Sequence, residues 1–239
     1  LFDTVRGATK RIRSDANSVE GTDSEGITTL DTNGWTMRGK DAINKNDNND
    51  MDKVFRLNLI NSSTGYKSAN MIGTNSNEGI NNLAVFSSIT HLGSNPSLLG
   101  FILRPTVVPR DTYKNIKDRT EFSINHITIS QIDEAHHTSY KYNSKISEFD
   151  KTKLIEEYKK NWNVPFVKDS PVQIGCKYLN EYFIKENDTL LIVGSIEEIF
   201  VKEKMLKKDG FIKLEDGDVT TICLLYTSDA ADERSSVDL

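Results

Sequence analysis

The middle of the chain alternates apolar and polar runs, as a folded domain does, and several of these segments are typical of β-strands. The strand-like segments are residues 65–76, 82–92, 97–104, 121–129, 172–181 and 190–201. The first two runs flank a polar turn that contains Glu78 and Gly79, which predicts an antiparallel hairpin. The third run follows Pro96 and is apolar almost throughout, which predicts a strand buried on both faces.

Helices are expected between these strands. Pro109 precedes the sequence DTYKNIKD, which predicts a short helix with Asp111 as its N-cap. Two more helical stretches are expected, around 132–142 and over 149–158. Strands outnumber helices, so the fold class is mainly β, and we expect a closed antiparallel barrel with peripheral helices.

Composition changes twice along the chain and predicts three pieces. Residues 1–50 are polar and rich in Asp, Asn, Thr and Gly, and they end in turn-forming residues. Residues 51–222 have the alternation of a folded domain. Residues 223–239 form a third piece, CLLYTSDAADERSSVDL.

Charge and cysteine content exclude several classes of protein. The 239 residues carry a formal net charge of -5 without a basic stripe, which argues against a general nucleic-acid binder. No apolar run reaches the length of a membrane span. The two cysteines, Cys176 and Cys223, lack CxxC spacing and suit a reducing compartment. The first residues lack the apolar core of a signal peptide, so we expect a cytoplasmic protein.

Familiar catalytic and metal motifs are absent from the sequence. It contains no GxGxxG, Walker A or GxSxG motif, which removes support for a Rossmann dehydrogenase, a P-loop enzyme or an α/β-hydrolase. His136 and His137 are adjacent and lack the i, i+4 spacing of a zinc helix, so no metal site is predicted.

The chemistry concentrates in residues 82–116. This span contains two apolar runs, the pair Ser87-Ser88, the arginines Arg104 and Arg110, and the start of the predicted helix. Apolar strands can contact a flat ring, whereas hydroxyls, arginines and a helix N-terminus can hold a phosphate. Flavin mononucleotide (FMN) has both parts, so these residues indicate a flavoprotein.

Residues 52–222 resemble the flavin reductase family with the FMN-binding split barrel. The matching segments are RLNLINS (56–62), GYK (65–67), NLAVFSS (82–88), HLGSNP (91–96), RPT (104–106), PRDTYKNI (109–116), INH (124–126) and SEF (147–149). The resemblance implies a homodimer that binds FMN and takes hydride from NADH or NADPH. It also implies a monooxygenase partner that receives the reduced flavin.

The resemblance also assigns binding residues. Ala84, Phe86, Ser87 and Ser88 are expected to line the flavin, and Arg104, Arg110 and Thr112 to contact its phosphate. Lys67 and Thr106 are weaker phosphate candidates, and His126 is a neighbour of the ring. Each has a structural alternative: Phe86 as core, Ser87 as a strand residue, and the arginines as solvated surface charges. No catalytic side chain is predicted, because hydride transfer is the cofactor's own chemistry.

The two ends of the chain resemble sequences from outside the flavin reductase family. Residues 2–8, 10–11 and 30–36 resemble a concanavalin A-like lectin module of phage tail proteins, of which too little is present to close a sandwich. Residues 223–239 resemble a translated sequencing adapter, and the alternative is a genuine disordered tail. We therefore expect a metagenomic chimera around the flavin domain.

Two other functions stay open. The chain could be an FMN-binding electron carrier that reacts weakly with NAD(P)H. From another class, residues 1–50 alone would support a glycan- or surface-binding phage module. The fold does not choose among these functions, because function belongs to the site.

Overall fold

The computed structural model describes residues 60–104 and 109–222. The chain divides into two compact units, and residues 66–222 belong to the larger one. Residues 60–63 form a helical turn in the smaller unit. The predicted lectin-like segment 1–50 and the predicted adapter segment 223–239 lie outside the described residues.

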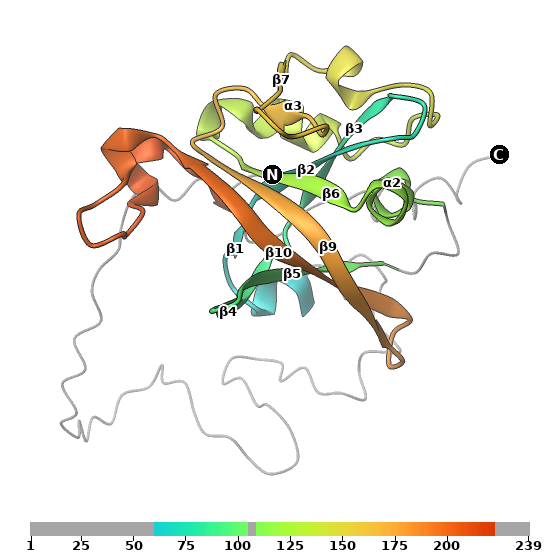
Figure 1. The fold of residues 1–239 in the computed structure, drawn as a ribbon, viewed down its shortest axis with the longest axis horizontal. Helices are drawn as coiled ribbons and strands as arrows, with labels where there is room; N and C mark the ends of the chain where they lie inside the picture. Colours follow the sequence, from blue (N-terminus) through green and yellow to red (C-terminus); the bar gives the residue numbers. More distant parts are fainter. Residues whose placement is uncertain (1–59, 105–108, 223–239) are drawn as a thin grey trace, which may run out of the picture. The chain divides into compact units, whose positions relative to one another are not determined.

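A seven-stranded antiparallel sheet organises the larger unit (Figure 1). Its spatial order is β3-β2-β6-β9-β10-β5-β4. The strands are β2 (Asn70–Asn75), β3 (Asn81–Phe86), β4 (Thr90–Ser94), β5 (Ser97–Leu103), β6 (Glu121–His126), β9 (Val172–Ile184) and β10 (Thr189–Val201). The mainly β fold class predicted from the strand-like segments is therefore confirmed.

Two short strand pairs and a few helices surround this sheet. The pairs are β1 (Lys67–Ser68) with β11 (Thr221–Ile222), and β7 (Glu156–Glu157) with β8 (Phe166–Val167). The helices are α2 (Asp111–Arg119), α3 (Ile132–His137) and the 3₁₀ turns η2 (Ile129–Gln131), η3 (Glu148–Lys151), η4 (Glu203–Met205) and η5 (Leu214–Gly217).

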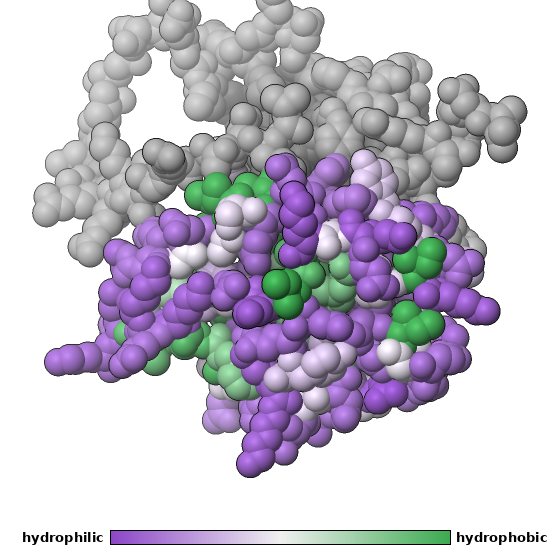
Figure 2. Space-filling view, turned by 90° about the horizontal axis from the view of Figure 1, so that it is seen from above, coloured by the Kyte–Doolittle hydropathy of each residue, from purple (hydrophilic) through white to green (hydrophobic). Residues whose placement is uncertain are grey.

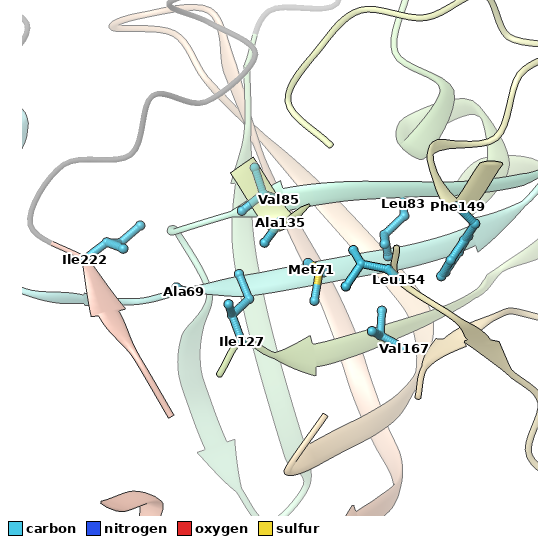
Figure 3. Packing of buried hydrophobic residues seen from close by; sticks show 10 residues of the cluster. All are labelled: Ala69, Met71, Leu83, Val85, Ile127, Ala135, Phe149, Leu154, Val167 and Ile222. Carbon is cyan, nitrogen blue, oxygen red and sulfur yellow. The ribbon is translucent and has the colours of Figure 1, made fainter. Parts of the chain in front are cut away.

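Side chains of β2 alternate between two hydrophobic cores, as the pleat of a strand requires. On the outer face, Met71 packs with Leu83 and Val85 of β3 and with residues of the covering loops (Figure 3). The whole outer cluster is Ala69, Met71, Leu83, Val85, Ile127, Ala135, Phe149, Leu154, Val167 and Ile222.

On the inner face, Ile72 belongs to a second cluster inside the curved sheet. Phe101 is fully buried there, and its ring centroid lies 5.3 Å from that of Phe86 and 5.8 Å from that of Phe122, both edge-on. The other buried members are Leu99, Leu103, Ile116, Ile124, Cys176 and Ile192. Ala84 and Phe86 of β3 lie on this inner face and are only half-buried, so they are the members of the face that a ligand could contact.

The outer face of the sheet also receives residues 156–167, and two glycines permit their close approach. A Cβ atom at Gly73 would lie 2.3 Å from the carbonyl oxygen of Pro165, and one at Gly175 would lie 2.2 Å from the ring of Trp162. The side chain of Asn125 accepts a hydrogen bond from the backbone N–H of Val167 at 2.9 Å. The two glycines and Asn125 therefore allow this segment to pack closely against the sheet.

The predicted helix at 149–158 is wrong. The chain forms η3 and then the strand β7, which pairs with β8. Thr152 donates its hydroxyl to the carbonyl of Glu148 and accepts the N–H of Leu154, so its side chain satisfies backbone groups that a helix would use. Leu154 is buried and β7 pairs with β8, so the segment forms a turn and a strand where a helix was predicted.

Other boundaries also shift. The hairpin of β2 and β3 is confirmed, but the predicted strand at 82–92 is broken after Phe86, because the chain crosses to the opposite edge of the sheet before β4. The helix expected at 132–142 ends at His137. The N-cap of α2 is Arg110, and Asp111 instead lies in the first turn, where a carboxylate favours the helix dipole.

The surface is predominantly hydrophilic on the face drawn in Figure 2, where hydrophobic patches are separate from one another. Among the described residues, no helix is both long and apolar enough to cross a membrane.

Candidate functional site

Three side chains meet in one row on the inner face of the sheet. Asn70 of β2 lies opposite Phe86 of β3 on one side and opposite His126 of β6 on the other. Residues paired directly across antiparallel strands project to the same face and contact one another. The predicted ring neighbours Phe86 and His126 are therefore brought together, with Asn70 between them.

Asn70 and His126 both contain a buried polar atom that lacks a partner. Asn70 is 1% exposed, and its Nδ2 donates to Ser68 Oγ at 2.9 Å. Within the described part of the chain, Asn70 Oδ1 and His126 Nδ1 make no hydrogen bond. Each such group costs about 1–3 kcal/mol when buried, and native proteins contain few of them. Two on neighbouring strands make this row a candidate ligand site.

Burial lowers the pKa of His126 to about 4. Its imidazole is therefore neutral near pH 7, and one ring nitrogen is a donor while the other is an acceptor. A neutral imidazole suits hydrogen bonding to an uncharged ring better than binding of an anion.

The predicted ring-lining residues take up different positions. Ala84 is half-buried opposite Ile72, on the same inner face as Phe86. Ser87 and Ser88 are also half-buried, just beyond the end of β3. Ser88 Oγ accepts the N–H of Ile102 at 3.1 Å and lies 3.1 Å from the carbonyl of the same residue, to which it donates. Its hydroxyl is therefore engaged in joining β3 to β5.

The inner face of β3 is a half-buried stripe. Asn82, Ala84 and Phe86 are all half-buried, whereas Leu83 and Val85 between them face the outer core and are buried. Four residues of strand cover about 13 Å. Ala84, at the centre of this stripe, has a smaller side chain than Asn82 or Phe86.

A polar network stands at the far end of that stripe, where α2 begins. Asn82 donates to the hydroxyls of Thr112 at 2.9 Å and Thr74 at 3.3 Å, and Asn115 donates to Thr74 at 3.1 Å. Thr112 is buried in the first turn of α2, and Arg110 precedes it, half-buried. A helix N-terminus with an arginine beside it is a favourable place for an anion.

The remaining phosphate candidates are less closely grouped. Arg104 is half-buried directly after β5, and Lys67 is half-buried in β1. Thr106 lies outside the described residues. The structure therefore brings Phe86 and His126 into one row and puts Arg110 and Thr112 at the start of one helix, separated by the length of the β3 stripe.

Glu148 is a buried carboxylate beside this stripe. Its Oε2 accepts the backbone N–H of Leu83 at 2.8 Å, which satisfies a donor on the edge strand β3. Burial, with a smaller contribution from Asp111, raises the pKa of Glu148 to about 7. Its charge therefore changes near neutral pH close to the start of α2.

Sequence reasoning missed both Asn70 and Glu148 as site residues. The available signal for Asn70 was a polar residue at the inner-face positions of β2, in register with Ile72 and Thr74. Its importance depends on its pairing with His126, which is distant in the sequence. Residues 60–104 and 109–222 contain no cluster of three or more His, Cys, Asp or Glu side chains that could hold a metal ion.

The geometry agrees with similarity to known proteins. A family model described as flavin reductase like domain matches residues 64–231. A split-barrel protein of Shewanella frigidimarina NCIMB 400, assigned as a flavin reductase, is 38% identical with a TM-score of 0.72. The alignment covers 74% of this chain and 88% of that one.

Two more distant structures share the fold. Component B of nitrilotriacetate monooxygenase from Bacillus cereus has a TM-score of 0.67 at 20% identity, covering 77% of this chain and 92% of its own. An FMN-binding protein from Thermus thermophilus has a TM-score of 0.52 at 19% identity, covering 62% of this chain and 77% of its own. Together with the first structure, they confirm the split-barrel architecture predicted from the sequence.

The family match also bears on the extent of the domain. It runs past residue 222 into the segment that resembles an adapter, and none of the comparisons supports the predicted adapter or lectin origin of the two ends. The match spans well over half of the sequence. The chain belongs to the flavin reductase like domain family.

Proposed function

We propose that the chain binds FMN along the inner face of β3 and works as an NAD(P)H-dependent flavin reductase. The observation that carries this proposal is the half-buried stripe of Asn82, Ala84 and Phe86. At one end of the stripe lies the row of Phe86, Asn70 and His126, which offers an aromatic ring and neutral polar groups. At the other end lies the start of α2 with Arg110. This order of features matches a flat ring, a linker and a phosphate.

The residues present fit FMN on chemical grounds. Phe86 is half-buried, so it can contact a ring face while it packs on Phe101. Ala84, Ser87 and Ser88 would lie beside the ring. Arg104, Arg110 and Thr112, with Lys67 and Thr106 as weaker candidates, would surround the phosphate, because arginine and hydroxyl donors recognise phosphate oxygens.

When bound, the flavin supplies the capacity to accept hydride from a nicotinamide. The chain's own task is to hold the ring in place and to orient the nicotinamide against it. His126 would contribute contact and hydrogen bonding, since an imidazole with a pKa of about 4 carries no imidazolium proton to donate near pH 7 and is a weak base. We therefore assign no side chain to acid-base catalysis.

The proposal is tested on the purified full chain. Titration with FMN should produce a yellow protein with a perturbed visible spectrum, and anaerobic addition of NADH or NADPH should bleach it. A yellow protein that does not bleach would support the alternative of an FMN-binding electron carrier. Absence of flavin binding at micromolar FMN would refute both flavin functions, and the glycan-binding alternative would then rest on residues 1–50.

Partners and location belong to the same proposal. We expect a homodimer in the cytoplasm that passes reduced flavin to a separate monooxygenase. Support comes from shared fold with component B of a monooxygenase. Sedimentation would determine the oligomeric state, and stimulation of a flavin-dependent monooxygenase by the chain plus NAD(P)H would test the transfer.

A further inference from the structure

We infer that Asn70 and His126 together recognise the imide edge of the flavin ring, the edge at which an N–H is flanked by two carbonyls. This inference rests on the proposed function, because it assigns a role to two residues towards that cofactor. It adds Asn70 as a binding residue and defines which edge of the ring the β2-β6 row faces.

The first support is geometric. Asn70 and His126 are direct partners in the antiparallel ladder, so their side chains leave the sheet on the same face, side by side. Phe86, which is half-buried and packs on the inner core, is the partner of Asn70 on the other side. A ring that contacts Phe86 would therefore present one edge to Asn70 and His126.

The second support is the state of the polar atoms. Asn70 is almost completely buried, and its Nδ2 is already bonded to Ser68 Oγ. Its Oδ1 is an acceptor and has no donor among the described residues. His126 Nδ1 has no hydrogen-bond partner among them either. A buried amide oxygen in this condition is stabilised by a donor from outside the described residues, and a ligand N–H is one such donor.

The third support is chemical complementarity. The imide edge offers an N–H to Asn70 Oδ1 and a neighbouring carbonyl to an N–H on His126 Nδ1. Burial lowers the pKa of His126 to about 4, so the imidazole is neutral and can have its proton on that nitrogen. An acceptor and a donor side by side match an adjacent N–H and C=O, whereas two acceptors or two donors would not.

The decisive experiment changes the ligand before the protein. Dissociation constants of the full chain for FMN and for N3-methyl-FMN, which lacks the imide N–H, would be measured by quenching of flavin fluorescence. We expect methylation to weaken binding about tenfold or more, because it leaves Asn70 Oδ1 without its donor and adds bulk at a closed edge. Equal dissociation constants would overturn the inference and leave the proposed FMN binding intact.

Variants then locate the effect. Asn70→Ala should weaken FMN and reduce the preference for FMN over N3-methyl-FMN to less than about threefold. Ser68→Ala is the matched control, because it removes the partner of Asn70 Nδ2 and leaves Oδ1 in place, so the preference should persist. A preference unchanged in Asn70→Ala would refute the role of that residue. If Asn70→Ala does not fold, the comparison of the two ligands on the natural chain still decides the matter.

Failure of the proposed function would give a different result from failure of this inference. If the chain bound neither FMN nor its methylated analogue, the proposed function itself would fall. Binding of FMN with no discrimination at the imide position would reject only this inference.

Discussion

The hydroxyl of Ser88 hydrogen-bonds both backbone groups of Ile102, each at 3.1 Å. Ser88 follows β3, which is one edge of the seven-stranded sheet, and Ile102 belongs to β5, next to the opposite edge. Because the two ends of the strand order meet here, the sheet must curve round on itself. A single side chain therefore joins the ends of the barrel beside the proposed flavin site.

Replacing Ser88 by alanine should destabilise the fold. The change leaves an N–H and a carbonyl of Ile102 without their present partner, so we expect a loss of about 1–3 kcal/mol in the free energy of unfolding. Denaturant titration of Ser88→Ala would measure it. Ser97→Ala is a suitable control, since the hydroxyl of Ser97 bonds only locally to the carbonyl of Ser94 at an exposed position. Similar losses in both variants would contradict the closing role of Ser88.

Glu148 should make stability depend on pH. Its pKa of about 7 in the folded chain exceeds the ordinary value of 4.5, so the folded state binds more protons than the unfolded state between these values. The contribution of Glu148 is therefore fully present below about pH 4.5 and is lost as the pH rises through 7. The whole change amounts to roughly 3 kcal/mol at most.

The pH effect can be isolated with Glu148→Gln, whose side-chain oxygen can still accept the N–H of Leu83. The difference in unfolding free energy between the natural chain and the variant should favour the natural chain near pH 5 and shift against it near pH 8. Glu203→Gln, at an exposed position, serves as the control variant. A difference for Glu148→Gln that does not change across this interval would contradict the prediction.

The phosphate assignment predicts selective loss of affinity. Arg104→Ala and Arg110→Ala should weaken FMN much more than riboflavin, because only FMN has the phosphate that these guanidinium groups would contact. A charge-assisted hydrogen bond contributes about 1.5–3 kcal/mol, so a loss of roughly tenfold or more is expected for FMN. Fluorescence titration with both flavins provides the measurement.

Arg119→Ala is the matched control for the arginines, since Arg119 ends α2 and donates to the carbonyl of Ser76. It should leave both affinities close to those of the natural chain. Equal losses for FMN and riboflavin in Arg104→Ala and Arg110→Ala would remove those residues from the phosphate site.

Gly175→Ala should disrupt the packing of Trp162 against the sheet. The added Cβ would lie 2.2 Å from the indole ring, so the ring or the strand must move. Overpacking of this kind costs about 1–3 kcal/mol, which a thermal melt would detect. Combining it with Trp162→Ala should recover part of the loss attributable to the clash, because the two changes are coupled. Strictly additive losses would show that the contact is not the cause.

Local patterns predicted much of this protein. The hairpin of β2 and β3, the helix at α2 and the mainly β class all follow from apolar periodicity and turn residues, and the structure confirms them. The error at 149–158 has a definite cause. A segment that is apolar on one side can be either a helix or a covering loop, and the choice depends on Thr152 and on pairing of β7 with β8.

The candidate site was predictable only in part. Phe86, Ser88, Arg110 and Thr112 stand in segments that resemble a known family, so the sequence pointed to them. Neither Asn70 nor the double hydrogen bond of Ser88 to Ile102 is visible in the order of residues.

By itself, the sequence determined the elements and the family, because strand periodicity, turn chemistry and characteristic short segments are properties of neighbouring residues. Only the tertiary structure decided which residues face one another. Asn70 lies beside His126 because β2 pairs with β6 in one register, and a shift by a single residue would turn both side chains to the other face. That register is set by burial on both faces of the sheet, which depends on the whole domain.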